Sequence, residues 1–205
     1  MAKDPPLNNE RFKRSHPKSV RLSVVIPCFN MELYLPQCID SILGQNMSDS
    51  DIEIIIVNDG SKDKTSSIAH RYAKSHPNIH VIDKENAGVG AARNSGLDEA
   101  QGELIYFLDP DDYLAKSTLL PLVEKTEELQ TDILSFASTR AEGAVLLDSK
   151  NLHQNLMPTA VKDGIATIAE RKFRNESWWF IIRRKFLVKN NFRFVTIQRS
   201  ELLFC

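Results

Sequence analysis

Polar and apolar residues follow one another along the chain in blocks whose lengths suit strands and helices. Four short runs are dominated by apolar, often β-branched residues, which is typical of strands buried on both faces of a parallel sheet: residues 22–27, 52–57, 79–82 and 103–108. In the stretches between these runs, apolar or small residues recur at helical spacing, which predicts helices over residues 33–43, 64–75 and 89–100. Alternating strands and helices predict an α/β fold with a doubly wound, mostly parallel sheet flanked by helices.

The local signals at the helix ends agree with this pattern. Pro36 is accepted only in a first turn, so the first helix begins close to it. Asp63 is expected to cap the second helix. Beyond residue 113 we expect a helix over 117–130, a strand over 132–137 and a strand passing into a helix over 177–187, whereas residues 138–170 carry no clear pattern.

Composition narrows the class of protein. The chain has 205 residues, 42% of them apolar, and a formal net charge of -1, so it has no global positive field to attract nucleic acid, and we expect no nucleic-acid partner. Residues 1–20 are rich in Lys, Arg and Pro and are predicted to be a flexible basic lead-in, with contact to a membrane surface or a partner as the alternative.

Cysteines and histidines give no sign of a zinc site. The odd cysteine count, without metal-ligand spacing, predicts a reduced, cytoplasmic setting in which Cys28 and Cys38 are small buried residues. No apolar run reaches about 18 residues, and the N-terminus lacks the form of a secretory signal.

Three of the predicted strands end in polar residues, and the carboxyl ends of parallel strands lie at the edge where ligands bind in such folds. The first is "FLDPDDY", in which Asp109, Asp111 and Asp112 follow a strand directly. Carboxylates this close repel one another unless a cation is present, and hard ions such as Mg²⁺ or Mn²⁺ take one or two of them together with substrate phosphates. A solvated turn is the alternative.

The other two strand ends are "VNDGSKD" and "ENAGVGAARNSG". Asp59 either forms a plain turn with Gly60 or accepts hydrogen bonds from a nucleotide base or ribose. The glycines near Arg93 imitate a dinucleotide fingerprint, but an arginine occupies the third glycine position and the stretch follows the third strand. A cation at the start of a helix suits a diphosphate instead, with a surface helix residue as the alternative. A nucleotide diphosphate with a metal ion is the simplest ligand that uses all three strand ends.

Four strings in this order resemble the large inverting family 2 of GT-A fold glycosyltransferases: "LSVVIPCFNMELYLPQCIDSIL", "IEIIIVNDGSKD", "NAGVGAARNSGL" and "GELIYFLDPDDYL". The resemblance covers about residues 21–125 and implies a nucleotide-sugar-binding half there, with an acceptor-side half over 126–205. It implies these roles: Pro27, Phe29 and Glu32 line the nucleotide pocket; Asp59 contacts the base, usually uracil; Arg93 lies near the base or diphosphate; Asp109 and Asp111 form the DxD pair for ribose, metal and diphosphate, with Asp112 beside them as a further metal ligand. Asn58 stands where the family usually has the first aspartate of a pair.

The family also needs a catalytic base from its more variable second half. Here "SWWFIIRRKFLVKNNFRF" followed by "SELLF" is similar to the stretch that carries it, and Glu201 is the candidate base. Ser200 replaces the first acidic residue of the usual Glu-Asp pair, so Glu201 as an ordinary terminal residue is the alternative. Family members usually continue with a helix of the acceptor site, so we expect the acceptor pocket to be incomplete in this chain.

The resemblance implies a glycosyltransferase that depends on Mn²⁺ or Mg²⁺, inverts the anomeric centre, and moves a sugar from a donor such as a UDP-sugar to a saccharide or lipid-linked acceptor in polysaccharide synthesis. We expect this enzyme to act in the cytoplasm, with peripheral contact at the inner face of the membrane as a further expectation. One alternative is a relative that binds the nucleotide sugar without transferring it. Another is a sugar-phosphate nucleotidyltransferase, which the loop "PCFNMELYLP" disfavours because it has no glycine and no Lys or Arg.

Overall fold

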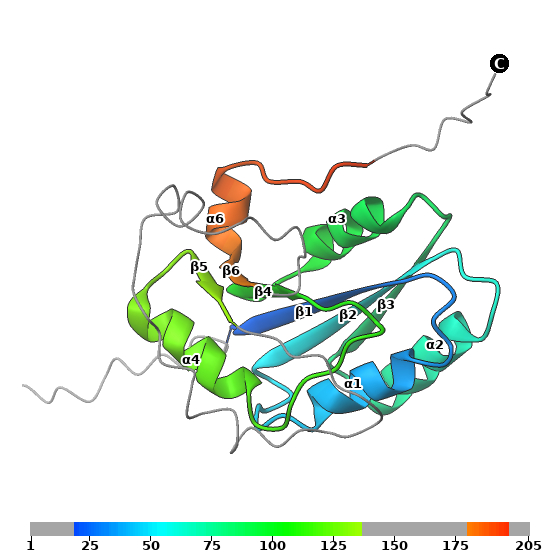
Figure 1. Cartoon of the computed structure of the whole chain (residues 1–205), viewed down its shortest axis with the longest axis horizontal. Helices are drawn as coiled ribbons and strands as arrows, with labels where there is room; N and C mark the ends of the chain where they lie inside the picture. The colour runs from blue at the N-terminus through cyan, green and yellow to red at the C-terminus, as the bar shows by residue number, and fades with distance from the viewer. Residues whose placement is uncertain (1–18, 137–179, 197–205) are drawn as a thin grey trace, which may run out of the picture.

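A six-stranded sheet in the order β3-β2-β1-β4-β6-β5 organises the computed structural model, which describes residues 19–136 and 180–196 (Figure 1). The strands are β1 (Leu22–Cys28), β2 (Ile52–Asp59), β3 (Ile79–Lys84), β4 (Leu104–Phe107), β5 (Ile133–Ser135) and β6 (Phe180–Arg183). The helices are α1 (Leu35–Leu43), α2 (Thr65–Ser75), α3 (Val89–Glu99), α4 (Leu119–Leu129) and α6 (Arg184–Lys189). The α/β fold with a mostly parallel sheet, predicted from the apolar runs, is confirmed.

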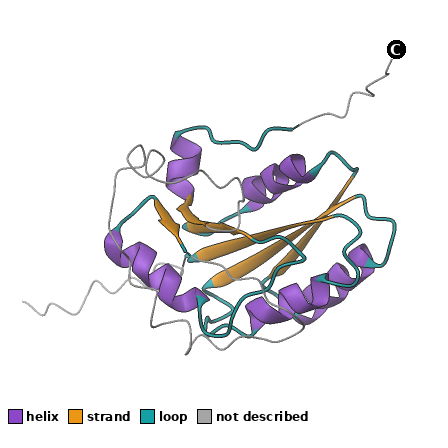
Figure 2. Cartoon of the chain, in the orientation of Figure 1, coloured by secondary structure: helices purple, strands orange, loops and turns teal. Residues whose placement is uncertain are grey.

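The centre of the sheet is parallel and covered by helices on both faces (Figure 2). Every residue of β1, β2 and β4 is buried, which explains why these runs show no alternation of polar and apolar positions. Side chains of alternate strand positions pack with α1, α2 and α4 on one face and with α3 and α6 on the other. The carboxyl ends of β1, β2, β3 and β4 therefore meet at one edge of the sheet.

The chain completes the sheet with two strands from its second half. β6 pairs antiparallel with β4, through Leu104 opposite Arg183, and β5 pairs antiparallel with β6 on the outside. The strand that passes into a helix, expected over 177–187, is confirmed by β6 and α6, but its place between β4 and β5 was not predicted.

Several smaller expectations can be compared with the described residues. Pro36 lies in the first turn of α1, and Cys28 and Cys38 are free and buried, as predicted. Within residues 19–136 and 180–196, which the structure describes, no helix has the length and apolar character needed to cross a bilayer. The unpatterned stretch 138–170, most of the basic lead-in, Cys205 and Glu201 lie outside the described residues.

Candidate functional site

A cavity of about 650 Å³ opens at the carboxyl ends of β1, β2 and β3. We call it the carboxyl-edge cavity; it is lined by Phe29, Gly60, Lys62, Asp83, Lys84, Glu85 and Asn86. Phe29 directly follows β1, and the residue is 45% exposed, so an aromatic ring is available to a ligand. Pro27 lies buried inside β1, two residues before Phe29.

The loops that follow β1 and β2 are tied to each other beside this cavity. The backbone N–H of Glu32 donates to Asp63 Oδ2 at 3.0 Å, and the Glu32 carboxylate accepts from the N–H of Lys64 at 2.9 Å. Asp63 also accepts from the N–H of Thr65, the first residue of α2, at 2.9 Å. The N-cap residue of α2 is Lys64 and it has no side-chain cap hydrogen bond, so the prediction that Asp63 is the cap was wrong; Asp63 instead closes the turn one residue before the cap. Glu32, predicted to line the nucleotide pocket, thus holds the two loops in a fixed relation.

Asp59 is the polar end of β2 and is nearly fully buried, with 3% of its side chain exposed. Its Oδ1 accepts from Lys84 Nζ and from the N–H of Ala87, both at 3.0 Å, and its Oδ2 accepts from the N–H of Gly88 at 2.8 Å. A buried carboxylate needs such partners to remain charged. Asp59 therefore fixes the loop after β3, which forms one wall of the carboxyl-edge cavity.

Glycine is required at position 60 by both backbone geometry and space. The φ angle of Gly60 is +74°, a backbone conformation that residues with a side chain rarely adopt. A Cβ there would lie 2.9 Å from the backbone nitrogen of Asn86. The turn after β2 and the loop after β3 can approach this closely only because residue 60 has no side chain.

Asp83 lines the same cavity and accepts several hydrogen bonds. Asn58 Nδ2 donates to it at 2.7 Å, Ser66 Oγ donates at 3.0 Å, and His70 Nε2 lies 2.6 Å from its Oδ2. Partial burial opposes ionisation, but the hydrogen bonds from Asn58, His70 and Ser66 outweigh it and lower the pKa of Asp83 below its usual range. The carboxylate is thus negatively charged at neutral pH.

Arg93 and Asp109 come from different elements and form an ion pair. Arg93 Nη2 lies 2.6 Å from Asp109 Oδ1, and the two side chains are 15% and 25% exposed. The Arg93 Nε is buried and has no hydrogen-bond partner. The guanidinium therefore keeps donor capacity beyond its pairing with Asp109, as a group that binds a diphosphate must.

Asp111 and Asp112 continue the turn that Asp109 begins, since the N–H of Asp112 donates to the Asp109 carbonyl at 3.0 Å. Asp111 is exposed and Asp112 is half-buried. Burial, together with the charges of Asp111 and Asp109, raises the pKa of Asp112 to about 6. Negative charge at this turn is therefore only partly compensated by Arg93.

The turn suits a hard divalent cation by its donor chemistry, because its side chains offer only carboxylate oxygens and carry uncompensated charge. The described residues contain no group of three or more His, Cys, Asp or Glu side chains arranged around a metal. Mg²⁺ and Mn²⁺ need only one or two protein carboxylates when substrate phosphates complete the shell. Asp111 and Asp112 are the residues that would hold such an ion.

The structure brings together Arg93 and Asp109 directly, and it places Phe29 and Asp59 beside one cavity. Sequence reasoning missed Lys84, which pairs with Asp59 and lines the cavity. The rule that ligands bind at strand ends would have found it, since it is the last residue of β3. Phe194, which lies against Arg93, gave no signal because its partner is a hundred positions away in the chain.

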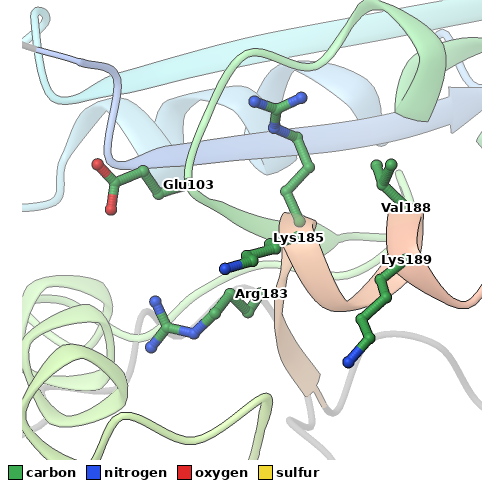
Figure 3. A pocket seen from close by; sticks show the side chains of 6 residues that line it. Glu103, Arg183, Lys185, Val188 and Lys189 are labelled. Carbon is green, nitrogen blue, oxygen red and sulfur yellow. The ribbon is translucent and has the colours of Figure 1, made fainter.

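A second cavity, of about 500 Å³, lies at the opposite end of the central strands (Figure 3). It is lined by Glu103, Arg183, Arg184, Lys185, Val188 and Lys189. Within the part of the chain that the structure describes, none of the four basic side chains forms an ion pair. We call this the basic cavity; it was not predicted.

The sequence matches the family model described as glycosyl transferase family 2 over residues 23–193. The chain belongs to this family, and the six-stranded sheet with its flanking helices is the GT-A fold of its structural neighbours.

Individual relatives agree with this assignment. The chain is 32% identical over 176 residues to the uncharacterized glycosyltransferase EpsJ of Bacillus subtilis. This alignment covers 84% of this chain and 51% of EpsJ. The chain is 38% identical over 144 residues to the minor teichoic acid biosynthesis protein GgaB of the same organism, covering 69% of this chain and 16% of GgaB. The chain thus spans about half of EpsJ and a much smaller part of GgaB.

Among solved structures, residues 1–349 of TarS from S. aureus match with a TM-score of 0.72 and 27% identity, covering 89% of this chain and 52% of that one. The same protein in complex with UDP-GlcNAc matches with a TM-score of 0.70 and 27% identity, covering 86% and 49%. TarS is also known in complex with UDP.

Proposed function

We propose that this chain is the donor-binding part of a metal-dependent, inverting glycosyltransferase that uses a UDP-sugar. The observation that carries the proposal is the ion pair of Arg93 with Asp109, which lies at the same sheet edge as the carboxyl-edge cavity and the carboxylates of the DxD turn. A cation, a cavity with an exposed aromatic ring and a carboxylate turn at one edge suit the three parts of a nucleoside diphosphate and its metal. The similarity to TarS, which binds UDP-GlcNAc, supports the uridine nucleotide.

Each side chain has a distinct role in this proposal. Phe29 stacks on the base at the cavity mouth, and Asp59 with Lys84 fixes the cavity wall and contacts the base or ribose. Pro27 and Glu32 shape the same edge. Arg93 donates to the diphosphate with the N–H groups that Asp109 leaves free.

Asp111 and Asp112 hold a Mn²⁺ or Mg²⁺ ion in this proposal. When bound, such an ion neutralises charge on the departing diphosphate. The raised pKa of Asp112 supports the assignment, because the turn carries more negative charge than Arg93 neutralises.

The transfer is a single in-line displacement in the proposal. The oxygen of an acceptor hydroxyl forms a bond to the sugar C1 as the bond from C1 to the diphosphate oxygen breaks, which inverts the anomeric centre. The hydroxyl proton goes to a carboxylate that acts as general base, for which Glu201 remains the candidate. The acceptor side is supplied by residues 126–205 together with any chain that follows.

The acceptor is a hydroxyl of a polysaccharide or glycolipid in this proposal. Support comes from GgaB, whose name places it in minor teichoic acid biosynthesis, and from EpsJ as a glycosyltransferase. A relative that binds the donor without transferring the sugar is the second candidate, favoured by Ser200 in place of an acidic residue. Hydrolysis or transfer of a UDP-sugar distinguishes the two.

We also propose peripheral contact with an anionic membrane at the cytoplasmic face. Ser19, the first residue that the structure describes, donates its hydroxyl to Glu103 Oε1 at 2.9 Å. Glu103 lines the basic cavity (Figure 3), so the described chain begins beside that cavity. Clustered Lys and Arg residues attract anionic headgroups. Co-sedimentation with phosphatidylserine vesicles tests this contact on wild type and two variants. Lys185→Glu/Lys189→Glu should lose binding, whereas Lys74→Glu on α2 should bind as wild type does. Equal binding of wild type and both variants would reject the contact.

Calorimetric titration of UDP tests the donor proposal, with GDP as the comparison and with Mn²⁺ present or absent. We expect UDP to bind more tightly than GDP, to need the metal, and to lose at least about tenfold in affinity in Asp111→Asn. Asp49→Asn is the matched control, since Asp49 is an exposed aspartate outside the site. If the affinity for UDP is the same without the metal and in Asp111→Asn, the metal site is rejected. If neither UDP nor GDP binds, the donor site is rejected.

A further inference from the structure

The segment formed by residues 192–195, which follows α6, lies along the N-terminal half of α3 (Figure 1). The side chain of Asn94 binds its backbone on both sides: Oδ1 accepts from the N–H of Phe194 at 2.9 Å, and Nδ2 donates to the Phe194 carbonyl at 3.0 Å. The Asn94 side chain thus satisfies both the N–H and the carbonyl of Phe194, as the backbone of a neighbouring strand would. This fixes the position of residue 194 relative to α3.

Gly90 allows the same segment to come close to α3. A Cβ at position 90 would collide with the carbonyl oxygen of Val195. Positions 90, 93 and 94 are three and four residues apart, so they share one face of the helix. The glycine, arginine and asparagine of the "GAARN" string therefore all face the 192–195 segment.

The ring of Phe194 lies between the sheet and Arg93. Its centroid is 4.8 Å from that of Phe107 in an edge-to-face contact, and the Arg93 guanidinium carbon lies 5.3 Å from the ring centroid. Phe107 is the last residue of β4, two positions before Asp109. The guanidinium therefore has a carboxylate as one neighbour and an aromatic ring as another.

We propose that Phe194 is a positioning residue for donor binding, which holds the Arg93 guanidinium in the orientation that meets the diphosphate. The inference rests on the proposed function of this site. An arginine side chain has many rotamers, and each contact that selects one before the ligand arrives reduces the ordering that binding must supply. Asp109 restrains one nitrogen of Arg93, and the ring face of Phe194 restrains the plane of the group and attracts its charge.

The proposal gives the second half of the chain a role at the donor site. The 192–195 segment follows β6 and α6, so its place against α3 depends on the part of the chain that completes the sheet. Arg93 is thereby ordered by a residue that lies about a hundred positions further along the chain.

The first test follows Arg93 without any ligand. In the NMR spectrum of ¹⁵N-arginine-labelled protein, the Nε–H proton of Arg93 should be shifted by the ring of Phe194. Phe194→Leu should remove this shift and Phe194→Tyr should keep it. Val195→Ala should leave it unchanged, since Val195 is 82% exposed. An Arg93 signal that is the same in Phe194→Leu and wild type would overturn the proposal whether or not the protein binds a nucleotide.

The second test compares UDP with uridine by calorimetry on the same variants. Phe194→Leu should weaken UDP binding about three- to tenfold, as expected for one cation–π contact, and leave uridine binding unchanged. Phe194→Tyr should restore UDP affinity. Equal losses for UDP and uridine would show a merely structural role and overturn the inference, while a wild type that binds no UDP would overturn the proposed function even if the NMR shift of Arg93 is present.

Discussion

Asn58 at the end of β2 donates a hydrogen bond of 2.7 Å from Nδ2 to Oδ1 of Asp83, its register partner on β3. The Asn58 Oδ1 accepts from the N–H of Ser61 at 3.2 Å, so the amide uses a donor and an acceptor at once. A side chain that faces the Asp83 carboxylate here must donate a hydrogen bond, which an ionised aspartate cannot do. The asparagine in place of the usual aspartate is therefore matched to Asp83.

Asn58→Asp should destabilise the protein. It would place a second carboxylate against Asp83 at a position where residue 58 is only 5% exposed, and the free energy of unfolding should fall by about 1–3 kcal/mol. Urea unfolding measures the change. Asn46→Asp adds the same charge at an exposed site and should change stability little. In the Asn58→Asp background, Asp83→Asn should recover part of the loss; if it does not, the pairing of these residues is not the cause.

Asp83 also makes stability depend on pH. Its folded-state pKa is lowered below the unfolded value of about 3.9, so the stabilisation is present above that value and is lost as pH falls through the folded pKa. The free energy of unfolding of wild type should therefore approach that of Asp83→Asn as the pH falls from about 5 through the folded-state pKa of Asp83. The effect should be small, because the side chain is 45% exposed. Urea unfolding at several pH values tests this, and a constant difference between the two proteins would contradict it.

Gly90 and Asn94 should act on stability as one unit, because both hold the 192–195 segment against α3. Gly90→Ala would favour the helix by about 1 kcal/mol but would displace the Val195 carbonyl, so we expect a net loss of stability. Asn94→Ala should cost about 1 kcal/mol or more, because the backbone N–H and carbonyl of Phe194 lose their partners.

A double-mutant cycle measured by urea unfolding tests this coupling. Once Gly90→Ala has displaced the segment, Asn94→Ala should cost little more. Additive losses would mean that the two residues act independently. Ser95→Ala is a matched control on α3, since its hydroxyl bonds only to the Ala91 carbonyl of the same helix among the interactions described.

Lys84→Met should destabilise the edge of the sheet through Asp59. The substitution leaves a carboxylate with 3% exposure beside two backbone N–H donors and no cation, and the free energy of unfolding should fall by about 1–3 kcal/mol. Thermal or urea unfolding gives the value. Lys62→Met, at an exposed lysine of the same cavity, should cost much less. A loss in Lys84→Met that persists in the Asp59→Asn background would rule out the ion pair as its origin.

The central strands and the edge at which the site lies could be predicted from the sequence because they depend on local patterns. The apolar run 52–57 lies within β2, which is buried throughout, and polar residues directly after such runs fall at the carboxyl edge. The same rule placed Arg93 and Asp109 at this edge, since Arg93 lies in the first half of α3 and Asp109 follows the end of β4, but their ion pair was not predicted.

Contacts between distant parts of the chain could not be predicted in this way. Ile181 lies opposite Tyr106 on β4, and Phe194 lies against Arg93, yet nothing in either local pattern encodes its partner. The role of Glu32 was also hidden, because its hydrogen bond to the N–H of Lys64 depends on how two loops meet.

The insertion of β6 between β4 and β5 has a consequence for how the protein is made. A ribosome adds about 5–20 residues per second, so β4 (residues 104–107) leaves the exit tunnel seconds before its partner at residues 180–183 exists. During that interval one side of β4 has unpaired N–H and carbonyl groups beside fully apolar side chains, which is the kind of edge that joins other chains. Slow translation between β4 and β6 should therefore favour aggregation of the nascent chain, and a chaperone that covers this edge should raise the yield of folded protein.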